Sequence, residues 1–284
     1  VMDEHKLLEW SRTSGVTVHI ARACLLLYEK GSELPKGHED RKMKARTVLL
    51  GDNVVDAWYE QAEMEGLGSA PPAMEDNRAI DVKSLQPGYT QSVSDAESAY
   101  LQEWMKSKFA TWVHPPREYW PKDWAAKYRK PVCLLMLALY GHADSGGYWE
   151  EKSYGDAQAV GWEPVPDRRG VFYLKKEDAL MMIYVDDFKM SCRFEDEARL
   201  WKALQDRIRL SDPKRSDRYL GCYSRPFTAP VSAFRAILSN MPSQWTRKMM
   251  KARSASPQSR GRPRIRSDLC AASNTKCVRT STHS

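Results

Sequence analysis

The chain has 284 residues, 42% of them hydrophobic and 29% charged, which is enough apolar material for packed cores in about two domains. The formal net charge is +7, yet residues 226–284 hold 11 Lys and Arg against one Asp, so residues 1–225 are slightly acidic. Charge therefore gives no reason to class the body of the chain as a nucleic-acid binder, and the lack of an apolar run of about 18 residues excludes a membrane-spanning helix.

The first part of the chain mixes extended runs with one charged loop. β-prone runs at 16–20 and 47–50 flank the loop at 29–41, whose Gly and Pro residues favour a turn between two strands. We therefore expect extended structure on both sides of a connection in this region.

Regular elements alternate between residues 72 and 223. The expected elements, in chain order, are a helix at 72–84, a strand at 88–95, an irregular Pro- and Trp-rich stretch at 111–121, a strand at 131–140, a helix at 145–158, strands at 170–175 and 179–185, a helix at 194–209 and a short strand at 218–223. In the last helix Phe194, Ala198, Trp201, Leu204 and Ile208 recur at helical spacing, which indicates a core-facing stripe. The alternation predicts an α+β fold with helices on one face of a sheet.

Residues 226–284 differ in composition from the rest of the chain. Ser, Arg and Pro dominate residues 254–266 without a sustained period, which predicts a disordered tail. The tail is interpreted either as a solvated extension or out-of-frame sequence, or as a segment whose arginines bind phosphates in a salt-dependent way.

Two features bear on the cellular compartment. The chain begins at Val1 without a charged-then-apolar signal segment, so we expect a piece of a larger polyprotein that is not secreted. Six scattered cysteines form no Cys-x-x-Cys pair, which indicates a reduced, intracellular protein and disfavours a zinc site.

Two adjacent acids, Asp186 and Asp187, interrupt an otherwise β-prone apolar run. Asp is disfavoured in strands but common in turns, although the tight-turn pairs Asn-Gly and Asp-Gly are absent here. Two unit charges about 4 Å apart interact by roughly 4 kcal/mol at an effective dielectric of 20, and a cation is the natural compensation. The pair thus indicates either a hairpin turn or a metal site.

Further polar and glycine residues could belong to the same site. Asp95 ends the expected strand at 88–95, where it is either a helix N-cap or a third acid. Gly141 and Gly146 flank a strand-to-helix junction at which Asp144 or Ser145 can cap the helix. Such glycines permit close approach of a backbone or a ligand, and a plain capped turn explains the segment equally well.

Taken in order, these segments resemble the reverse transcriptase of copia-type long-terminal-repeat retrotransposons. Residues 184–187 (Tyr-Val-Asp-Asp) resemble the family's Tyr-x-Asp-Asp box, and residues 95–101 resemble its first-aspartate motif. Residues 139–141 with 148–149 resemble its Leu-Tyr-Gly … Trp-Tyr motif. Residues 44–46, 111–116 and 219–221 also fall in the family order, and the likeness spans about residues 15–225.

The resemblance implies a reverse-transcriptase-like fold of fingers and palm, with an antiparallel palm sheet backed by helices. Residues 1–71 would then be a fingers-like region, 72–225 the palm with the remaining fingers elements, and 226–284 the basic tail. Neither a thumb nor a ribonuclease H domain is recognisable after Arg225.

The resemblance also implies an activity, an RNA-directed DNA polymerase that uses two-metal nucleotidyl transfer. Asp95, Asp186 and Asp187 would hold two Mg²⁺ ions, with Mn²⁺ as a substitute. Tyr100 would select deoxynucleotides, Lys44 and Arg46 would contact the triphosphate, and Lys214 would protonate the leaving pyrophosphate, although each of these basic residues can equally be a solvated charge. The residues implied for contact with template or primer are Tyr184, Val185, Gly141 and Gly146.

The implied partners are an RNA template, a DNA primer, dNTPs and other Pol and Gag segments, in a cytoplasmic particle or the nucleus and away from membranes. Ala143-Asp144 stands where the family carries Lys-Gln, and no thumb is recognisable, so a second hypothesis is an inactive retrotransposon remnant that at most binds nucleic acid. A third is that the basic tail alone binds nucleic acid.

Overall fold

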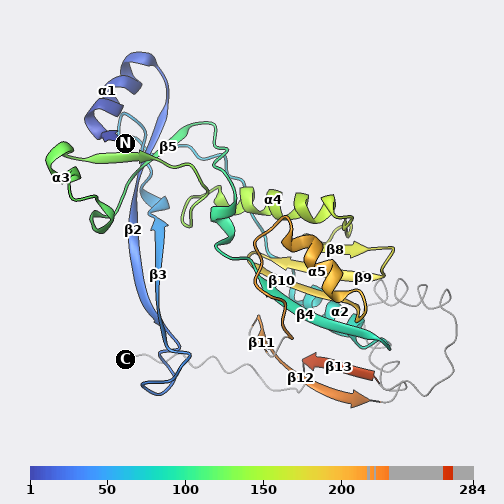
Figure 1. The fold of residues 1–284 in the computed structure, drawn as a ribbon. Coiled ribbons are helices and arrows are strands. Elements are labelled where there is room, and N and C mark those ends of the chain that lie inside the picture. The colour runs from blue at the N-terminus through green and yellow to red at the C-terminus, as the bar shows by residue number, and fades with distance from the viewer. Residues whose placement is uncertain (216–217, 221, 230–264, 271–284) are drawn as a thin grey trace. The chain divides into compact units, whose positions relative to one another are not determined.

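The computed structural model describes residues 1–215, 218–220, 222–229 and 265–270, which fold into two compact units (Figure 1). Unit 1 comprises residues 1–70 and 98–155, and unit 2 comprises residues 71–97 and the chain from 156 onward. Each unit has helices and a sheet of its own, which confirms the predicted α+β class. The reverse-transcriptase-like arrangement of fingers and palm stays a prediction.

Unit 1 is built on a five-stranded sheet in the order β1-β6-β5-β2-β3, with β2 and β5 parallel and the other neighbours antiparallel. Its strands are β1 (Met2–Asp3), β2 (Val18–Lys30), β3 (Lys42–Leu49), β5 (Ala110–His114) and β6 (Pro131–Leu134). Its helices are α1 (Glu4–Ser14) and α3 (Trp124–Lys127), with 3₁₀ turns at Gly51–Asn53, Ala99–Gln102 and Arg117–Tyr119. Leu7 and Leu8 of α1 pack against Val18 and Ile20 in a buried cluster.

The predicted turn between two extended segments is confirmed as the connection between β2 and β3. These strands pair from Ala23 opposite Leu49 to Lys30 opposite Lys42, which leaves residues 31–41 as the loop. The guanidinium of Arg41 donates to the Glu29 carboxylate at 2.6 and 2.9 Å and closes the base of that loop.

Two predictions for unit 1 need correction, and one helix of this unit was not predicted. Residues 111–121 are not irregular throughout, because β5 extends to His114 and proline enters only afterwards, where it ends the strand. The strand expected at 131–140 ends at Leu134. Helix α1 was not expected, since its short apolar pattern is weak beside the β-prone runs that follow it.

Unit 2 is built on an antiparallel five-stranded sheet in the order β4-β10-β9-β8-β7. The predicted helices at 72–84, 145–158 and 194–209 and the strands at 88–95, 170–175 and 179–185 are confirmed with small shifts at their ends. The strands are β4 (Tyr89–Asp95), β7 (Glu163–Pro164), β8 (Val171–Leu174), β9 (Ala179–Tyr184) and β10 (Asp187–Arg193). The helices are α2 (Met74–Ser84) and α5 (Glu197–Gln205), while α4 (Ser145–Ala159) lies mostly in unit 1 and ends in unit 2.

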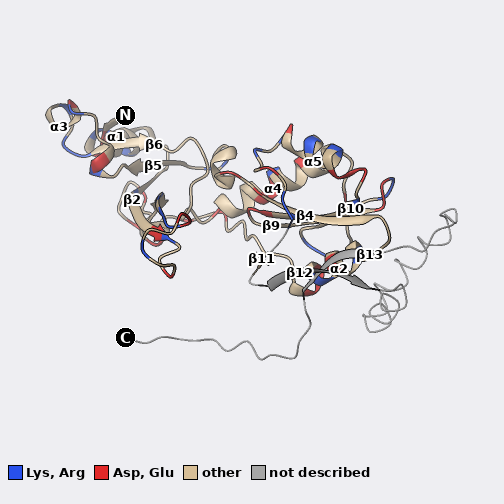
Figure 2. Cartoon of the chain, turned by 60° about the horizontal axis from the view of Figure 1, so that its bottom comes forward, with Lys and Arg blue, Asp and Glu red and all other residues tan. Residues whose placement is uncertain are grey.

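Helices cover both faces of this sheet, so the prediction of helices on one face was wrong. Val93 of β4 packs with Ala79 and Ile80 of α2, whereas the hydroxyl of the preceding Ser92 accepts a hydrogen bond from the Trp201 indole of α5. Neighbouring residues of a strand point to opposite faces, and Figure 2 shows α2 and α5 on the two sides of the strands. Strand β9 is buried along nearly its whole length, which a sheet covered on both faces requires.

Two further corrections concern the C-terminal part of unit 2. Phe194 precedes α5 and is 67% exposed, and Ala198 is exposed, so the predicted stripe is right only for Trp201, Leu204 and Ile208. The tail is not disordered throughout, because Ile265–Cys270 (β13) pairs with Cys222–Ala229 (β12), which also pairs with β11 (Arg218–Tyr219). The composition of the tail gives no signal for this pairing, and residues 230–264 and 271–284 lie outside the described ranges. Among the described residues, no helix is long and apolar enough to cross a membrane.

Candidate active site

The three acids predicted to share a site meet at one end of the unit 2 sheet. Strand β4 ends at Asp95, strand β10 begins at Asp187, and these two residues are paired opposite each other. The backbone N–H of Ala96 donates to the carbonyl of Asp186 at 2.6 Å, so the pairing continues past the carboxylates. The N-cap interpretation of Asp95 is wrong, since Ser98 precedes the next helical turn. We call Asp95, Asp186 and Asp187 the acid group.

The acid group has a distinct electrostatic character. Partial burial raises the pKa of Asp187 to about 6, with further contributions from the charges of Asp186 and Asp95 and a side-chain hydrogen bond with Asp95. The Asp187 carboxyl therefore keeps its proton to a higher pH than an isolated carboxyl does. Lys214 opposes this rise, but its ammonium lies 3.8 Å from the Asp95 carboxylate and is mostly exposed.

The segment after α5 pairs with the edge of β4 that is opposite to β10, close to the acid group. Val93 and Lys214 exchange backbone hydrogen bonds of 2.8 and 2.9 Å, which places Lys214 beside Asp95, as its predicted role requires. The Ser211 hydroxyl accepts a hydrogen bond from the backbone N–H of Asp95 at 3.0 Å. The backbone N–H of Ser211 in turn donates to the Asp95 carbonyl. Sequence reasoning missed Ser211, because a lone serine in a loop carries no signal.

Asp186 lies in a strained two-residue turn between β9 and β10, and Asp187 directly follows it. Tyr184 is paired with Asp187, which leaves Val185 and Asp186 as the turn. Val185 has a φ of +58°, a left-handed conformation that Gly or Asn adopts easily and a β-branched residue does not. The hairpin and the acid site are thus one feature rather than alternatives.

A buried tyrosine, Tyr219, contacts the backbone next to this turn. The hydroxyl of Tyr219 donates to the Asp187 carbonyl at 3.3 Å, and Tyr219 belongs to the buried cluster against which Tyr184 packs. Tyr219 lies in the segment 219–221 that the sequence analysis noted, although no role was assigned to it there. Tyr184 is half-buried on this packed surface.

The acid group does not form a finished metal cage. Within the described ranges, no three His, Cys, Asp or Glu side chains are placed so that they could hold one metal ion. Asp95 and Asp187 are nevertheless paired across neighbouring strands, and carboxylate oxygens are the ligands that Mg²⁺ prefers. The donor set therefore fits a hard divalent cation chemically.

Unit 1 contains the residues predicted to contact a nucleotide, and three of its side chains stack. The Tyr100 and Tyr140 rings are stacked with centroids 4.4 Å apart, and the Arg46 guanidinium lies 4.5 Å from the centre of the Tyr140 ring. We call Arg46, Tyr140 and Tyr100 the ring stack. A Cβ added at Gly146 would lie 2.6 Å from the Ser69 hydroxyl oxygen and 3.7 Å from that of Tyr100, so glycine leaves room here.

Lys44 and Arg46 lie two residues apart on β3 and therefore share a face. Both side chains are exposed, as a contact with a polyanion would require. Lys44 lies opposite Tyr28 in the register, which makes this face both basic and aromatic. Tyr140 lies in the segment 139–141 noted in the sequence, but no role was assigned to it there, because its partner Arg46 is far away in the chain.

Two predicted residues of unit 1 have structural tasks. Gly141 has a φ of +92°, and a Cβ added there would lie 2.0 Å from the Leu49 carbonyl oxygen, so glycine is needed for this close backbone approach. The buried Asp144 does not cap α4 with its side chain. Its carboxylate accepts the backbone N–H groups of Glu65 and Leu67 at 3.3 and 3.1 Å and so fixes that segment.

The site residues are divided between the units. Unit 2 holds the acid group with Tyr184, Val185 and Lys214, and unit 1 holds Lys44, Gly141, Gly146 and the ring stack. Comparisons with models of protein families and with curated proteins found no match to this sequence.

Proposed function

We propose that this chain is an RNA-directed DNA polymerase domain of the copia type, with the acid group as its catalytic centre. The observation that supports this most is the pairing of Asp95 with Asp187 across neighbouring strands, because it gathers acids from two distant segments. Like charges at the end of a sheet destabilise a fold, and carboxylates gathered in this way are typical of sites that bind divalent cations.

The strained turn supports the same proposal. A β-branched residue in the left-handed region costs free energy, and such strain clusters at functional sites. Val185 has this strained conformation directly before Asp186 and thereby fixes the position of Asp186 in the hairpin turn.

In this proposal Asp95 and Asp186 hold two divalent cations, with Asp187 completing the set. Bound Mg²⁺ or Mn²⁺ would supply charge neutralisation for phosphoryl transfer to a primer 3′-hydroxyl. Lys214 then places a proton-bearing ammonium beside the carboxylates, while Lys44 and Arg46 offer positive charge to a triphosphate. The partners are an RNA template, a DNA primer and dNTPs.

Primer extension by the full chain tests the proposal, with a DNA primer annealed to an RNA template, dNTPs and Mg²⁺. We expect incorporation, and a loss of at least about 100-fold in Asp186→Asn, because metal-assisted charge stabilisation supplies several kcal/mol. Asp206→Asn is the matched control. This acid is exposed at the C-terminal end of α5, and among the described side chains it pairs only with Lys202. Equal incorporation by Asp186→Asn would remove the assigned role.

A second candidate function is a remnant that binds nucleic acid without catalysis. It is favoured by the lack of a three-residue metal group among the described residues and by Asp144, which is committed to holding residues 65–67. Binding of primer–template without incorporation would support it. If deletion of 226–284 removes that binding and its salt dependence, the tail is the binding segment.

A further inference from the structure

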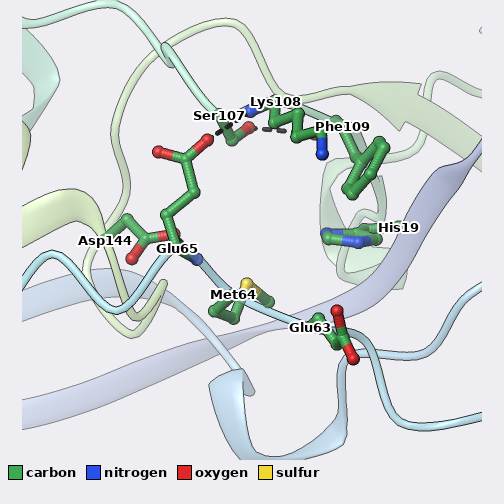
Figure 3. A pocket seen from close by; sticks show the side chains of 8 residues that line it. All are labelled: His19, Glu63, Met64, Glu65, Ser107, Lys108, Phe109 and Asp144. Atoms are coloured by element: carbon green, nitrogen blue, oxygen red, sulfur yellow. Dashed lines mark hydrogen bonds between the residues drawn. The ribbon is translucent and has the colours of Figure 1, made fainter.

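Unit 1 contains a pocket of about 190 Å³ that shares no residue with the acid group or the ring stack (Figure 3). It lies between β2, the segment 63–65, the segment 107–109 and Asp144. About six water molecules occupy this volume in liquid water, so the pocket suits a ligand of a few heavy atoms.

The wall of this pocket includes a buried histidine with an unsatisfied nitrogen. His19 is 3% exposed, and its buried Nδ1 has no hydrogen-bond partner among the described residues. The Phe109 ring lies against it, with centroids 5.3 Å apart, and Figure 3 shows an edge of the imidazole facing the cavity. Burial lowers the pKa of His19 despite the charges of Asp56 and Asp144, so the ring is neutral at pH 7 and has one nitrogen able to accept a hydrogen bond.

The charge of the lining is negative. Glu63, Glu65 and Asp144 contribute three carboxylates, against one ammonium from Lys108. Two of the carboxylates are fixed in place: Asp144 by the backbone of residues 65–67, and Glu65 by the backbone N–H of Lys108 at 2.6 Å. The Lys108 ammonium lies 5.0 Å from the centre of the Phe109 ring, so an aromatic face that attracts cations borders the cavity.

We propose that this pocket binds a small organic cation of the guanidinium or amidinium class, which donates N–H groups to the carboxylates and to the His19 imidazole. A planar cation with several donors matches a lining that offers carboxylates and an imidazole acceptor around an aromatic wall. The described residues here form no group able to hold a metal ion, which favours an organic cation.

The first test compares methylguanidine with its neutral isostere N-methylurea, by titration calorimetry on the full chain. We expect saturable 1:1 binding of methylguanidine with a Kd of about 1 mM, and at least tenfold weaker binding of N-methylurea. Equal binding of the two, or no saturation by about 20 mM methylguanidine, overturns the proposal.

Two exposed lining residues provide variants with opposite expected signs. Glu63→Gln removes one negative charge and should weaken methylguanidine binding about fivefold, whereas Lys108→Met removes the competing ammonium and should strengthen it about as much. Glu60→Gln, outside the lining and also exposed, is the control and should leave the Kd unchanged. His19→Phe keeps a ring but no acceptor and should weaken binding about tenfold.

The opposite signs separate ligand binding from damage to the fold, because a structural defect would weaken binding in both variants. Weaker binding in Lys108→Met, or no change in either charge variant, overturns the assignment of a cation. Tighter binding of inorganic phosphate than of methylguanidine to the unmodified chain overturns it as well.

Discussion

Two residues of strand β10, Asp187 and Lys189, lie next to carboxylates in environments with opposite electrostatics. Asp187 begins the strand beside Asp95 and Asp186, and these acids contribute to its raised pKa. Lys189, on the same face, is 1% exposed, and its ammonium donates to the Asp81 carboxylate and to Asn77 of α2. One carboxylate is thus neutralised by a buried lysine, and the other is surrounded by further acids.

The difference teaches where unit 2 is organised for stability and where it is not. A second buried lysine, Lys83, is likewise paired with a carboxylate, that of Asp178, which Tyr89 and Tyr173 also contact through their hydroxyl groups. Pairing with a buried lysine therefore recurs inside this unit, whereas the lysine beside the acid group, Lys214, is exposed. Perturbed groups that a fold leaves uncompensated are typical of functional sites.

The largest expected effect comes from breaking the compensated environment. Lys189→Met leaves the Asp81 carboxylate buried without its ammonium, and we expect a loss of about 3–5 kcal/mol in the free energy of unfolding, measured with urea. The double variant Lys189→Met/Asp81→Leu should regain most of this loss, because apolar side chains can replace a buried ion pair. A loss below about 1 kcal/mol in the single variant would show that Asp81 is solvated and that the comparison is wrong.

The sequence predicted the local elements of this fold better than its division into units. The helix at 145–158 and the strands at 170–175 and 179–185 carry their signals within a few residues of chain, as capping, apolar runs and turns do. The return of residues 98–155 to unit 1 depends on the parallel pairing of β5 with β2, a contact between distant segments that no local pattern encodes.

The candidate site was predictable only in part, for the same reason. Adjacent acids in a β-prone run are visible in the sequence, but their pairing with Asp95 was expected through the resemblance alone. Lys189 and Asp81 look like ordinary surface charges when they are read singly. Burial decides their role, and burial is a property of the packed fold rather than of either residue.

A smaller effect of opposite sign should come from the uncompensated environment. Because the pKa of Asp187 is raised from 3.8 to about 6, the folded state binds its proton more tightly than the unfolded state does. This contribution to stability is fully present below about pH 4 and is lost as the pH rises through about 6. Asp187→Asn should therefore stabilise the chain at pH 7 by about 1 kcal/mol, after allowance for solvent screening of a half-buried group.

Urea unfolding at pH 4 and pH 7 checks this sign. The difference between Asp187→Asn and the unmodified chain should shrink toward zero at pH 4, where the carboxyl is protonated in the folded state. Asp206→Asn, which removes an exposed acid, should show no such dependence on pH. Destabilisation by Asp187→Asn at pH 7 would mean that the carboxylate is compensated after all.

The smallest effect concerns the ring stack of unit 1, where a positive charge is exposed rather than buried. If Tyr140 holds the Arg46 guanidinium in place, a double-mutant cycle of Arg46→Met and Tyr140→Leu should give a coupling of about 0.5 kcal/mol in urea unfolding. Tyr140→Phe keeps the ring and should keep the coupling. A coupling of zero would make Arg46 a free surface charge, as mobile as a solvated lysine. A measurable coupling means that unit 1 restrains its cation through an aromatic face, whereas unit 2 holds its acids through backbone pairing, so the two regions would place opposite charges by different means.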